Sequence, residues 1–480
     1  MRIFPRVLSA IALTITFVAS AVPARQIERI MTQPDGSTVR LTLKGDEFYH
    51  FYVTDDGQMV LRNDDGAYMF AEVNAEGKLS PSKVQASDAA NRTQAQRTFL
   101  NSISRENITE AIRSTAANSP RMARAPMSNK APAQRVGPTT NQSAGIGLFS
   151  SASFPTTGSP HACIILVEYQ DVKFKTSYAT SAKNYFTNML TQRGFNESGG
   201  TGSALDYFSD ASNGKFTPSF DVYGPITLEN NRSYYGGNDA IGDDLNPADM
   251  ALEACRQLNS TVDFTQYDTN NDTFIDNVFI IYAGEGEASG GPDDSVWPHA
   301  WNVGAATGYY YIFDGVKLAE YGCTCEWDGI YNKPDGVGTF CHEFSHILGL
   351  PDEYDIDYGN AENLTPGIYS VMDQGPYNNN SRTPPTYSIV QRNALNWADV
   401  TVIEREVPAT ISLEHILTSH NGCIIQTSSK EEFFMLENRQ QSGWDAYIPG
   451  HGLLIWHVKY VKSYWITMSQ MPMHRIYTST

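Results

Sequence analysis

The chain has 480 residues, which is too long for one ordinary domain, so two or three domains are expected. Hydrophobic residues make up 41% of it, including 26 Tyr, 22 Phe and 7 Trp, enough to build a sizeable core. The net charge of −19 repels nucleic acid and anionic membrane surfaces. It therefore excludes a nucleic-acid partner and suits an exported protein that binds divalent cations.

Residues 1–24 have the features of a secretory signal peptide. Arg2 and Arg6 give a positive start, an apolar run follows, and small residues stand at Ala21 and Ala24. The apolar run is short for a membrane span, so we predict cleavage after Ala21 or Ala24 and no membrane span in the mature form. The protein is expected outside the cytoplasm, as a secreted, periplasmic or cell-surface protein.

Residues 25–112 are predicted to form a β-rich propeptide. Short β-branched and aromatic runs alternate with Asp-Gly and Glu-Gly turns, which is typical of an antiparallel meander, and a polar helical stretch ends the segment. Residues 113–158 contain Arg and Lys but no acidic residue, and are rich in Ala, Ser, Pro and Thr. Such a composition predicts a disordered linker, which is either simply solvated or cut by an activating protease.

Residues 159–400 are predicted to form the catalytic domain. A nearly continuous apolar run at 162–168 indicates a strand in a sheet covered on both faces, and a second such strand is predicted at 277–282. Residues 401–480 return to β patterning and predict a β-rich C-terminal region. The six Cys all lie after residue 160 and permit disulfides without predicting their pairing.

The most informative motif is H-E-x-x-H-x-x-G-x-x-D, formed by His342, Glu343, His346, Gly349 and Asp352. Two His four positions apart project from the same face of a helix and can bind one metal ion. Gly tolerates the left-handed backbone of a sharp helix exit, so Asp352 can turn back toward the metal as a third ligand. Glu343 can lie beside the open coordination position.

A second candidate metal site is an acidic loop with the spacing of a calcium loop. Its predicted ligands are Asp268, Asn270, Asp272, the carbonyl of Phe274, and Asp276. Thr273 replaces the usual Gly and no Glu occupies position 12, so a polar turn is the alternative. If calcium binds there, its role is structural.

His299 and Met372 are further candidates. His299, in WPHAW, either contacts the active site or substrate, or packs as an ordinary side chain. Met372 lies in GIYSVMDQG, where a Met in a tight turn after the metal helix can pack beneath the ligands.

The stretches GVGTFCHEFSHILGLPDEYD and SVMDQG resemble the M6 family of secreted zinc metalloproteases, the immune inhibitor A type, among the metzincin-like enzymes. The resemblance covers most of 160–458, and the N-terminal β segment resembles the pro-region of such enzymes. It stops in the last twenty or so residues, where a truncated or frame-shifted end is expected. The implied fold is an α/β (α+β) metzincin-like domain with a twisted mixed sheet and an active-site helix.

The resemblance implies zinc bound by His342, His346 and Asp352, with Glu343 as the general base and Met372 as the Met-turn residue. The implied function is hydrolysis of peptide bonds in extracellular proteins by a zinc-activated water, in an enzyme made as a zymogen.

Tyr369 or Tyr377, near the Met-turn, is a candidate for a hydrogen bond to the oxyanion. The alternatives for the whole chain are another zinc hydrolase or exopeptidase, and a catalytically silent surface-binding protein. The intact Glu343 argues against the silent protein, because a binding module needs no general base.

Overall fold

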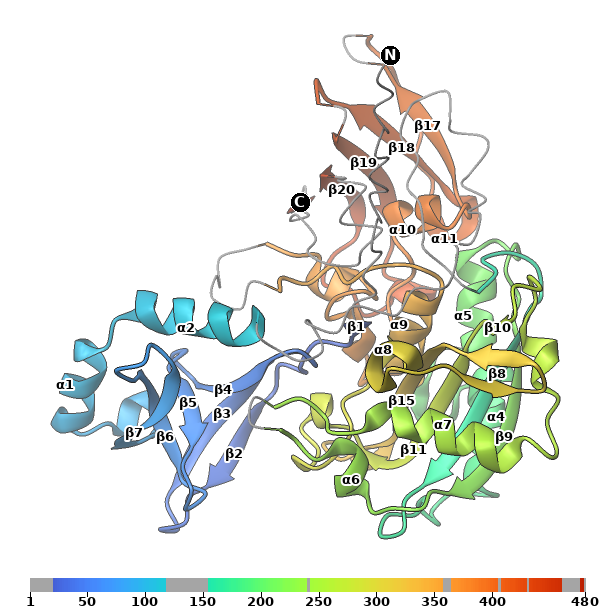
Figure 1. Ribbon diagram of the computed structural model, residues 1–480. Helices are drawn as coiled ribbons and strands as arrows, with labels where there is room; N and C mark the ends of the chain where they lie inside the picture. Colours follow the sequence, from blue (N-terminus) through green and yellow to red (C-terminus); the bar gives the residue numbers. More distant parts are fainter. Residues whose placement is uncertain are drawn as a thin grey trace, which may run out of the picture.

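The computed structural model describes residues 20–117, 154–239, 242–356, 364–404, 407–429, 431–459 and 475–478. They form three parts, which we call the N-terminal body (26–117), the central body (154–398) and the C-terminal sheet (from 399), as Figure 1 shows. The stretch before the N-terminal body, residues 20–25, lies against the central body, and we call it the cleft segment. Most of the predicted signal peptide and most of the predicted linker lie outside the described residues.

The N-terminal body is a six-stranded antiparallel sheet with its strands in chain order, which is a meander as predicted. The strands are β2 (Glu28–Thr32), β3 (Thr38–Gly45), β4 (His50–Thr54), β5 (Met59–Arg62), β6 (Tyr68–Val73) and β7 (Leu79–Gln85). Two helices follow, α1 (Gln94–Ser102) and α2 (Arg105–Ala117). Ile112 and Ala116 of α2 pack against Phe51 of β4, so one face of the sheet is covered by its own helix.

The central body is built on a mixed sheet in the order β1-β12-β15-β11-β8-β9, with β16 paired to β15. The strands are β1 (Ser20–Ala21), β8 (His161–Glu168), β9 (Ser219–Thr227), β11 (Val278–Glu285), β12 (His299–Asn302), β15 (Glu320–Asp328) and β16 (Lys333–Pro334). β9, β8, β11 and β15 run parallel, whereas β12 is antiparallel to β15 and β1 is antiparallel to β12. The mixed sheet agrees with the expected fold class. Its edge strand β12 is covered by the cleft segment.

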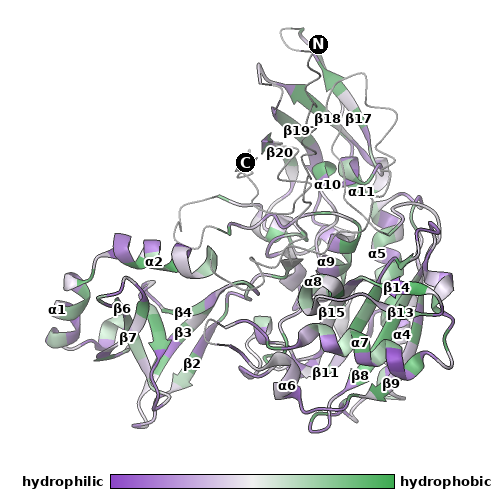
Figure 2. Cartoon of the chain, in the orientation of Figure 1, coloured by the Kyte–Doolittle hydropathy of each residue, from purple (hydrophilic) through white to green (hydrophobic). Residues whose placement is uncertain are grey.

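Helices cover both faces of this sheet. The helices of the central body are α4 (Ala182–Thr191), α5 (Ala204–Ala211), α6 (Arg232–Gly236), α7 (Pro247–Leu258), α8 (Val303–Thr307), α9 (Val337–Ile347) and α10 (Ile389–Ala394). Strand β8 has apolar side chains on both faces. Ile164 and Leu166 pack in one hydrophobic cluster with α9, and Ile165 and Val167 pack in the other with α7. Successive side chains of a strand point to opposite faces, so a strand buried on both faces is apolar throughout (Figure 2). A small sheet of β10 (Phe274–Ile275), β13 (Tyr311–Phe313) and β14 (Val316–Leu318) lies beside it.

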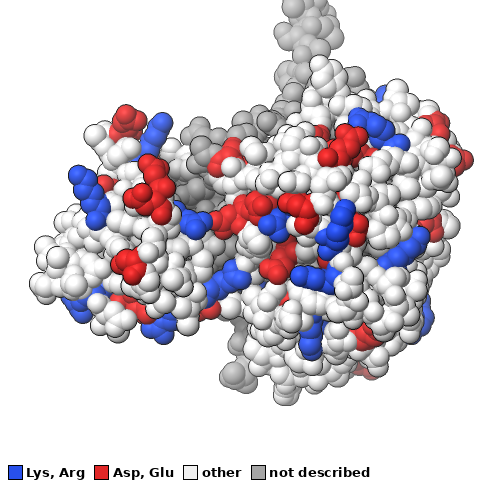
Figure 3. Space-filling model, turned by 90° about the horizontal axis from the view of Figure 1, so that it is seen from below, with Lys and Arg blue, Asp and Glu red and all other residues white. Residues whose placement is uncertain are grey.

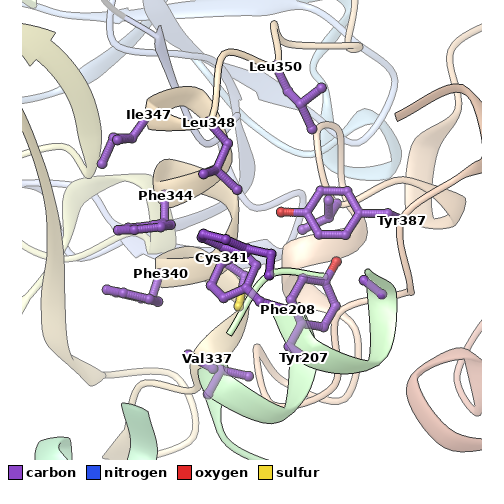
Figure 4. Close-up of a cluster of buried hydrophobic side chains, with 14 of the residues drawn as sticks. Tyr207, Phe208, Val337, Phe340, Cys341, Phe344, Ile347, Leu348, Leu350 and Tyr387 are labelled. Atoms are coloured by element: carbon purple, nitrogen blue, oxygen red, sulfur yellow. The ribbon is translucent and has the colours of Figure 1, made fainter. Parts of the chain in front are cut away.

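Helix α9 is held by an aromatic core on one face (Figure 4). Phe340 and Phe344 stack with ring centroids 5.5 Å apart, and Phe344 lies 5.4 Å from the ring of Phe208 on α5. At the start of the helix, a Cβ on Gly336 would come within 2.0 Å of the backbone oxygen of Ser381, so the neighbouring loop can approach only a glycine. These contacts fix both the position and the rotation of the helix that carries the metal motif.

The predicted C-terminal β region is a sheet that shares its core with the central body. Its elements are β17 (Asp399–Ile403), α11 (Ile416–Ser419), β18 (Asn421–Gln426), β19 (Glu432–Arg439), β20 (Gly452–Lys459) and β21 (Arg475–Thr478). Ile424, Met435 and Trp456 belong to the same buried cluster as Phe344 of α9. The C-terminal sheet is therefore packed on the central body rather than attached as a separate globule.

All six Cys are free and buried, so no disulfide forms among the described residues. No helix in the described part of the chain is long and apolar enough to cross a bilayer.

The N-terminal body meets the central body through charged side chains, and Figure 3 shows acidic and basic residues along the line where they join. His50 of β4 is the most buried of these contacts. Its ring stacks on Trp297 at 4.8 Å between centroids, and its Nε2 lies 3.2 Å from Oε1 of Glu287. Burial opposes protonation of His50, but the negative charges of Glu287 and Asp244 outweigh it and raise the pKa of His50 to about 9.

We expect the contribution of His50 to stability to depend on pH. A folded-state pKa above the ordinary 6.5 means that the contribution is complete below about pH 6.5 and is lost as the pH rises through about 9. The difference in melting temperature between the wild type and His50→Gln should therefore shrink from pH 7 to pH 10. Arg62→Gln is the control, because Arg62 pairs with Asp293 in the same interface. An unchanged difference for His50→Gln across the range would contradict the prediction.

Candidate active site

Helix α9 brings the two motif histidines and the third predicted ligand together. Nε2 of His342 lies 3.1 Å from Nε2 of His346, and these atoms lie 3.3 and 3.2 Å from Oδ1 of Asp352. Gly349 adopts φ +87°, the left-handed conformation that ends the helix and turns the chain back. The helix therefore ends at Gly349 as the sequence predicts, and the turn there places Asp352 beside the two imidazoles.

The histidines are oriented by bonds to backbone carbonyls. Nδ1 of His342 lies 2.6 Å from the carbonyl oxygen of Val371, and Nδ1 of His346 lies 2.8 Å from that of Leu350. A nitrogen that faces a carbonyl oxygen carries the proton, so both Nε2 atoms present lone pairs to the shared point. His342 is fully buried, and this burial lowers its pKa and favours the neutral ring.

These three atoms fit a zinc ion. Two imidazole lone pairs and a carboxylate oxygen at 3.1–3.3 Å from one another repel unless a cation lies between them. Ligands at ~2.0–2.1 Å from zinc in a tetrahedral arrangement are separated by ~3.3 Å, which matches this triangle. His342, Glu343 and His346 also place ligand atoms within 4.8 Å of one another, so potential metal ligands gather at this end of α9.

Glu343 lies beside this triangle and faces the cleft. Its Oε1 accepts a hydrogen bond of 2.8 Å from the backbone N–H of Val22, and its Oε2 is buried without a hydrogen-bond partner among the described residues. Burial raises the pKa of Glu343 well above its ordinary value. The Glu343 carboxylate thus contacts the peptide N–H of Val22 and not another residue of its own helix.

The turn at Met372 is tied to the ligand-bearing segment. Met372 is fully buried in the cluster beneath α9, and its carbonyl oxygen accepts a hydrogen bond from the N–H of Glu353. The Glu353 carboxylate accepts a 2.6 Å bond from Ser370, and burial raises the pKa of Glu353 to about 7. The carbonyl of Val371 in the same turn orients His342, so the turn positions two of the three candidate ligands.

The cleft segment lies across the active site as an extended chain. Ala21 pairs with His299 of β12 in antiparallel register. Trp297 Nε1 donates to the carbonyl oxygen of Val22 at 2.9 Å, and Ala21 and Val22 are both fully buried. Main chain therefore passes Glu343 on both sides, with Ser20 before it and Pro23 after it.

Two tyrosines bind carbonyl groups of this segment. Tyr354 donates to the carbonyl oxygen of Ala21 at 3.0 Å, and Tyr377 donates to that of Pro23 at 2.7 Å. Ala21 carries the carbonyl of the same peptide group whose N–H, on Val22, faces Glu343. Tyr354 thus holds the oxygen of the peptide group that lies in the site.

Sequence reasoning missed Tyr354 and proposed Tyr369 or Tyr377 for this contact. Tyr369 lies against Gly450 in the loop before β20, and Tyr377 contacts the main chain two residues farther along. The only sequence signal was proximity, because Tyr354 stands two residues after Asp352, the predicted third ligand.

His299 contributes backbone rather than side chain to the cleft. Its imidazole is buried, with Nδ1 2.6 Å from the carbonyl oxygen of Trp297 and Nε2 2.6 Å from the hydroxyl of Tyr321. Of the two predicted possibilities, the packed side chain is the one that the structure supports.

The acidic loop is organised by its own backbone. Asp268 accepts hydrogen bonds from the N–H groups of Asp272 and Thr273, and Asp276 accepts one from Thr269. Asn270 and Asp272 accept from the N–H groups of Asp272 and Phe274. Thr273 adopts φ +70°, the conformation for which calcium loops use Gly. Among the described residues, the carboxylates of this loop are not gathered as closely as the groups at His342.

A family model described as immune inhibitor A peptidase M6, catalytic domain, matches residues 159–396. Immune inhibitor A of Bacillus thuringiensis subsp. alesti is 31% identical over 237 residues, covering 42% of this chain and 33% of that protein. Pre-pro-metalloprotease PrtV of Vibrio cholerae serotype O1 (strain M66-2) is 28% identical over 200 residues, covering 36% of this chain and 21% of that protein. The matches thus span about a third and a fifth of the length of these relatives.

A solved structure of metalloproteinase-II from Bacteroides fragilis aligns over 77% of this chain and 86% of its own, with 10% identity and a TM-score of 0.24. A likeness this low carries no structural argument. The family match and the sequence relatives agree on one class, a metallopeptidase, and the matched range contains the whole His–Glu–His–Asp arrangement. Through residues 159–396, this chain belongs to the immune inhibitor A-type M6 metallopeptidase family.

Proposed function

We propose that this chain is a secreted zinc-dependent endopeptidase that hydrolyses peptide bonds of extracellular proteins. One observation carries the proposal: an extended peptide group lies in the cleft with its N–H on Glu343 and its carbonyl on Tyr354, beside three convergent metal ligands. Main chain continues in both directions from this peptide group in the precursor; the signal cleavage predicted after Ala21 or Ala24 would cut at or beside this group, so it marks the path that an extended substrate would follow. A cleft that admits chain on both sides supports an endopeptidase over an exopeptidase.

The proposed mechanism assigns each step to a side chain. His342, His346 and Asp352 would hold the zinc ion, which when bound would supply a Lewis acid for the carbonyl and for the attacking water. Glu343 takes the proton of the attacking water and delivers it to the leaving amine, whose position is marked by the N of Val22 at 2.8 Å. Tyr354 donates to the oxygen on which negative charge develops.

Latency is proposed to result from steric cover of the cleft. After signal cleavage behind Ala21, Val22 and Pro23 would remain against Glu343 and Tyr377, so a substrate could not reach the cleft until this segment leaves. Cys is absent before residue 163, so no thiolate of the propeptide can block the metal. The cleft segment would be released from the active site after an activating protease cuts the chain at basic residues of the 113–158 segment. Secretion is supported by the signal-like features of residues 1–24.

We expect the purified chain, treated with trypsin and then with trypsin inhibitor, to cleave casein at internal bonds. Zinc analysis should find about one ion per chain, because three protein ligands converge on one point. Incubation with 1,10-phenanthroline should abolish cleavage, and added zinc should restore it. A protein without zinc or chelator-sensitive cleavage would support the silent-protein alternative, whereas release of terminal residues only would support an exopeptidase.

We also propose that Asp268, Asn270, Asp272, the Phe274 carbonyl and Asp276 bind a structural calcium ion. The spacing and the left-handed Thr273 support this assignment. Calcium at millimolar concentration should raise the melting temperature of the chain, and Asp272→Ala should remove that rise. An equal rise in the variant would contradict the site.

A further inference from the structure

The cleft segment fills a second, charged position beyond the peptide group at Glu343. The guanidinium of Arg25 is buried, with NH1 2.8 Å from Oδ2 of Asp328, and it also lies 3.4 Å from Oδ1 of Asn380. Its Cζ lies 5.0 Å from the ring centre of Tyr331 and 5.3 Å from that of Tyr377. We call the four residues around it, Asp328, Tyr331, Tyr377 and Asn380, the Asp328 pocket.

The residues of the pocket belong to the central body, and its carboxylate is held by that body's own backbone. Asp328 ends β15, and its Oδ1 accepts hydrogen bonds from the N–H groups of Ile330 (3.0 Å) and Tyr331 (3.2 Å). The carboxylate is thereby fixed with Oδ2 toward the cleft segment. Tyr377 also binds the carbonyl of Pro23, so the pocket is continuous with the surface that holds the main chain.

The pocket needs a cation. Asp328 and Asp335 are both nearly fully buried, with 1% and 2% exposure. Burial and the nearby Asp328 raise the pKa of Asp335 to about 6, while the charge of Arg25 acts in the opposite direction. When the cleft segment leaves, Oδ2 of Asp328 loses its charged partner at 2.8 Å and is open to another positive group.

The position of the pocket along the cleft is set by the chain itself. Val22 presents the N–H that faces Glu343, so it corresponds to the first residue after the cleaved bond. Arg25 follows three residues later, ~10 Å along an extended chain. The pocket therefore corresponds to the fourth residue after the cleaved bond.

We propose that the Asp328 pocket is a substrate subsite that selects an arginine at the fourth residue after the cleaved bond. The proposal rests on the proposed endopeptidase function and names its substrate class: extended polypeptide with a basic side chain at that position. Arginine is preferred to lysine, because two tyrosine rings beside a carboxylate suit a planar guanidinium that stacks and hydrogen-bonds at once. Before activation the same pocket is occupied by Arg25 of the chain itself.

A purely structural ion pair is the competing explanation. In that case Arg25 and Asp328 anchor the cleft segment, and substrates bind without regard to their fourth residue. The two explanations differ in the behaviour of added peptides, so the test measures peptide selection rather than stability.

Selection is measured with the intact chain after trypsin treatment and trypsin inhibition. A peptide library is digested and the cleaved bonds are mapped by mass spectrometry. We expect arginine to be enriched at the fourth residue after the bond, and the enrichment to disappear in Asp328→Asn. This variant keeps the Oδ1 acceptor for Ile330 and Tyr331 and removes only the charge. Asp293→Asn is the matched control, because Asp293 pairs with Arg62 of the N-terminal body at a half-exposed position.

Binding provides a second readout that does not require cleavage. In a Glu343→Gln background, a labelled peptide of the sequence Ser-Ala-Val-Pro-Ala-Arg-Gln should bind at least ~10-fold more tightly than the same peptide with Ala for Arg, since loss of a buried charge contact costs this or more. The Asp328→Asn substitution should remove the difference.

Equal binding of the two peptides, or cleavage without preference for arginine, overturns the subsite and leaves the endopeptidase standing. Absence of cleavage with retained arginine-dependent binding overturns the proposed function and leaves the pocket as a ligand site.

Discussion

Replacement of Glu343 by glutamine should abolish peptide hydrolysis while leaving the zinc content unchanged. Glutamine has nearly the same shape, and its Oε1 can still accept the N–H that Val22 now donates at 2.8 Å. It cannot take a proton from water or return one to the leaving amine. Loss of a positioned general base typically costs ~10²–10⁴ in rate, and here the same group serves both proton transfers.

The measurement is kcat on an internally quenched peptide after activation, together with zinc per chain by atomic spectroscopy. His346→Ala is the contrasting variant, because it removes a ligand and should lose zinc and activity together. Glu343→Gln should lose activity alone. Wild-type activity in Glu343→Gln would refute the assignment of the general base.

Replacement of Tyr354 by phenylalanine should lower kcat by ~10²–10³ with little change in KM, as expected when one donor to the oxyanion is removed. The Tyr354 hydroxyl donates to the carbonyl oxygen of the peptide group that faces Glu343. The charge on that oxygen develops during reaction, so the bond strengthens in the transition state rather than in the bound substrate.

Tyr377→Phe is the matched control for this prediction. Tyr377 also donates to a carbonyl of the cleft segment, but that carbonyl belongs to Pro23, which does not react. Its loss should raise KM and leave kcat nearly unchanged. Equal effects of the two substitutions on KM alone would show that Tyr354 only binds substrate.

Several features follow from local sequence alone. The spacing of His342 and His346 places both rings on one face of a helix, and Gly349 marks the end of that helix. Asp-Gly and Glu-Gly turns between short β-rich runs predict the meander of the N-terminal body, although its outer strands β2 and β7 were not foreseen. The uninterrupted apolar run of β8 predicts a strand covered on both faces. Each of these depends on residues within one or two turns of chain, which is why periodicity is sufficient.

Other features required the tertiary structure. The contact of Val22 with Glu343 joins residues 321 positions apart, and it forms because β1 adds to the exposed edge of β12. No local pattern near residue 22 distinguishes a cleft segment from the end of a signal peptide. The domain boundary predicted at residue 400 also separates two parts that share one hydrophobic core, the central body and the C-terminal sheet.

The sequence by itself therefore indicated the helix that carries the candidate metal ligands, the type and spacing of those ligands, and the family to which the chain is similar. The tertiary structure decided which tyrosine binds the carbonyl oxygen of Ala21, and that Arg25 occupies the Asp328 pocket. The reason is physical: helix and strand periodicities are properties of neighbouring residues. The partners of Tyr354 and Arg25, in contrast, are set by the packing of segments about 300 residues apart.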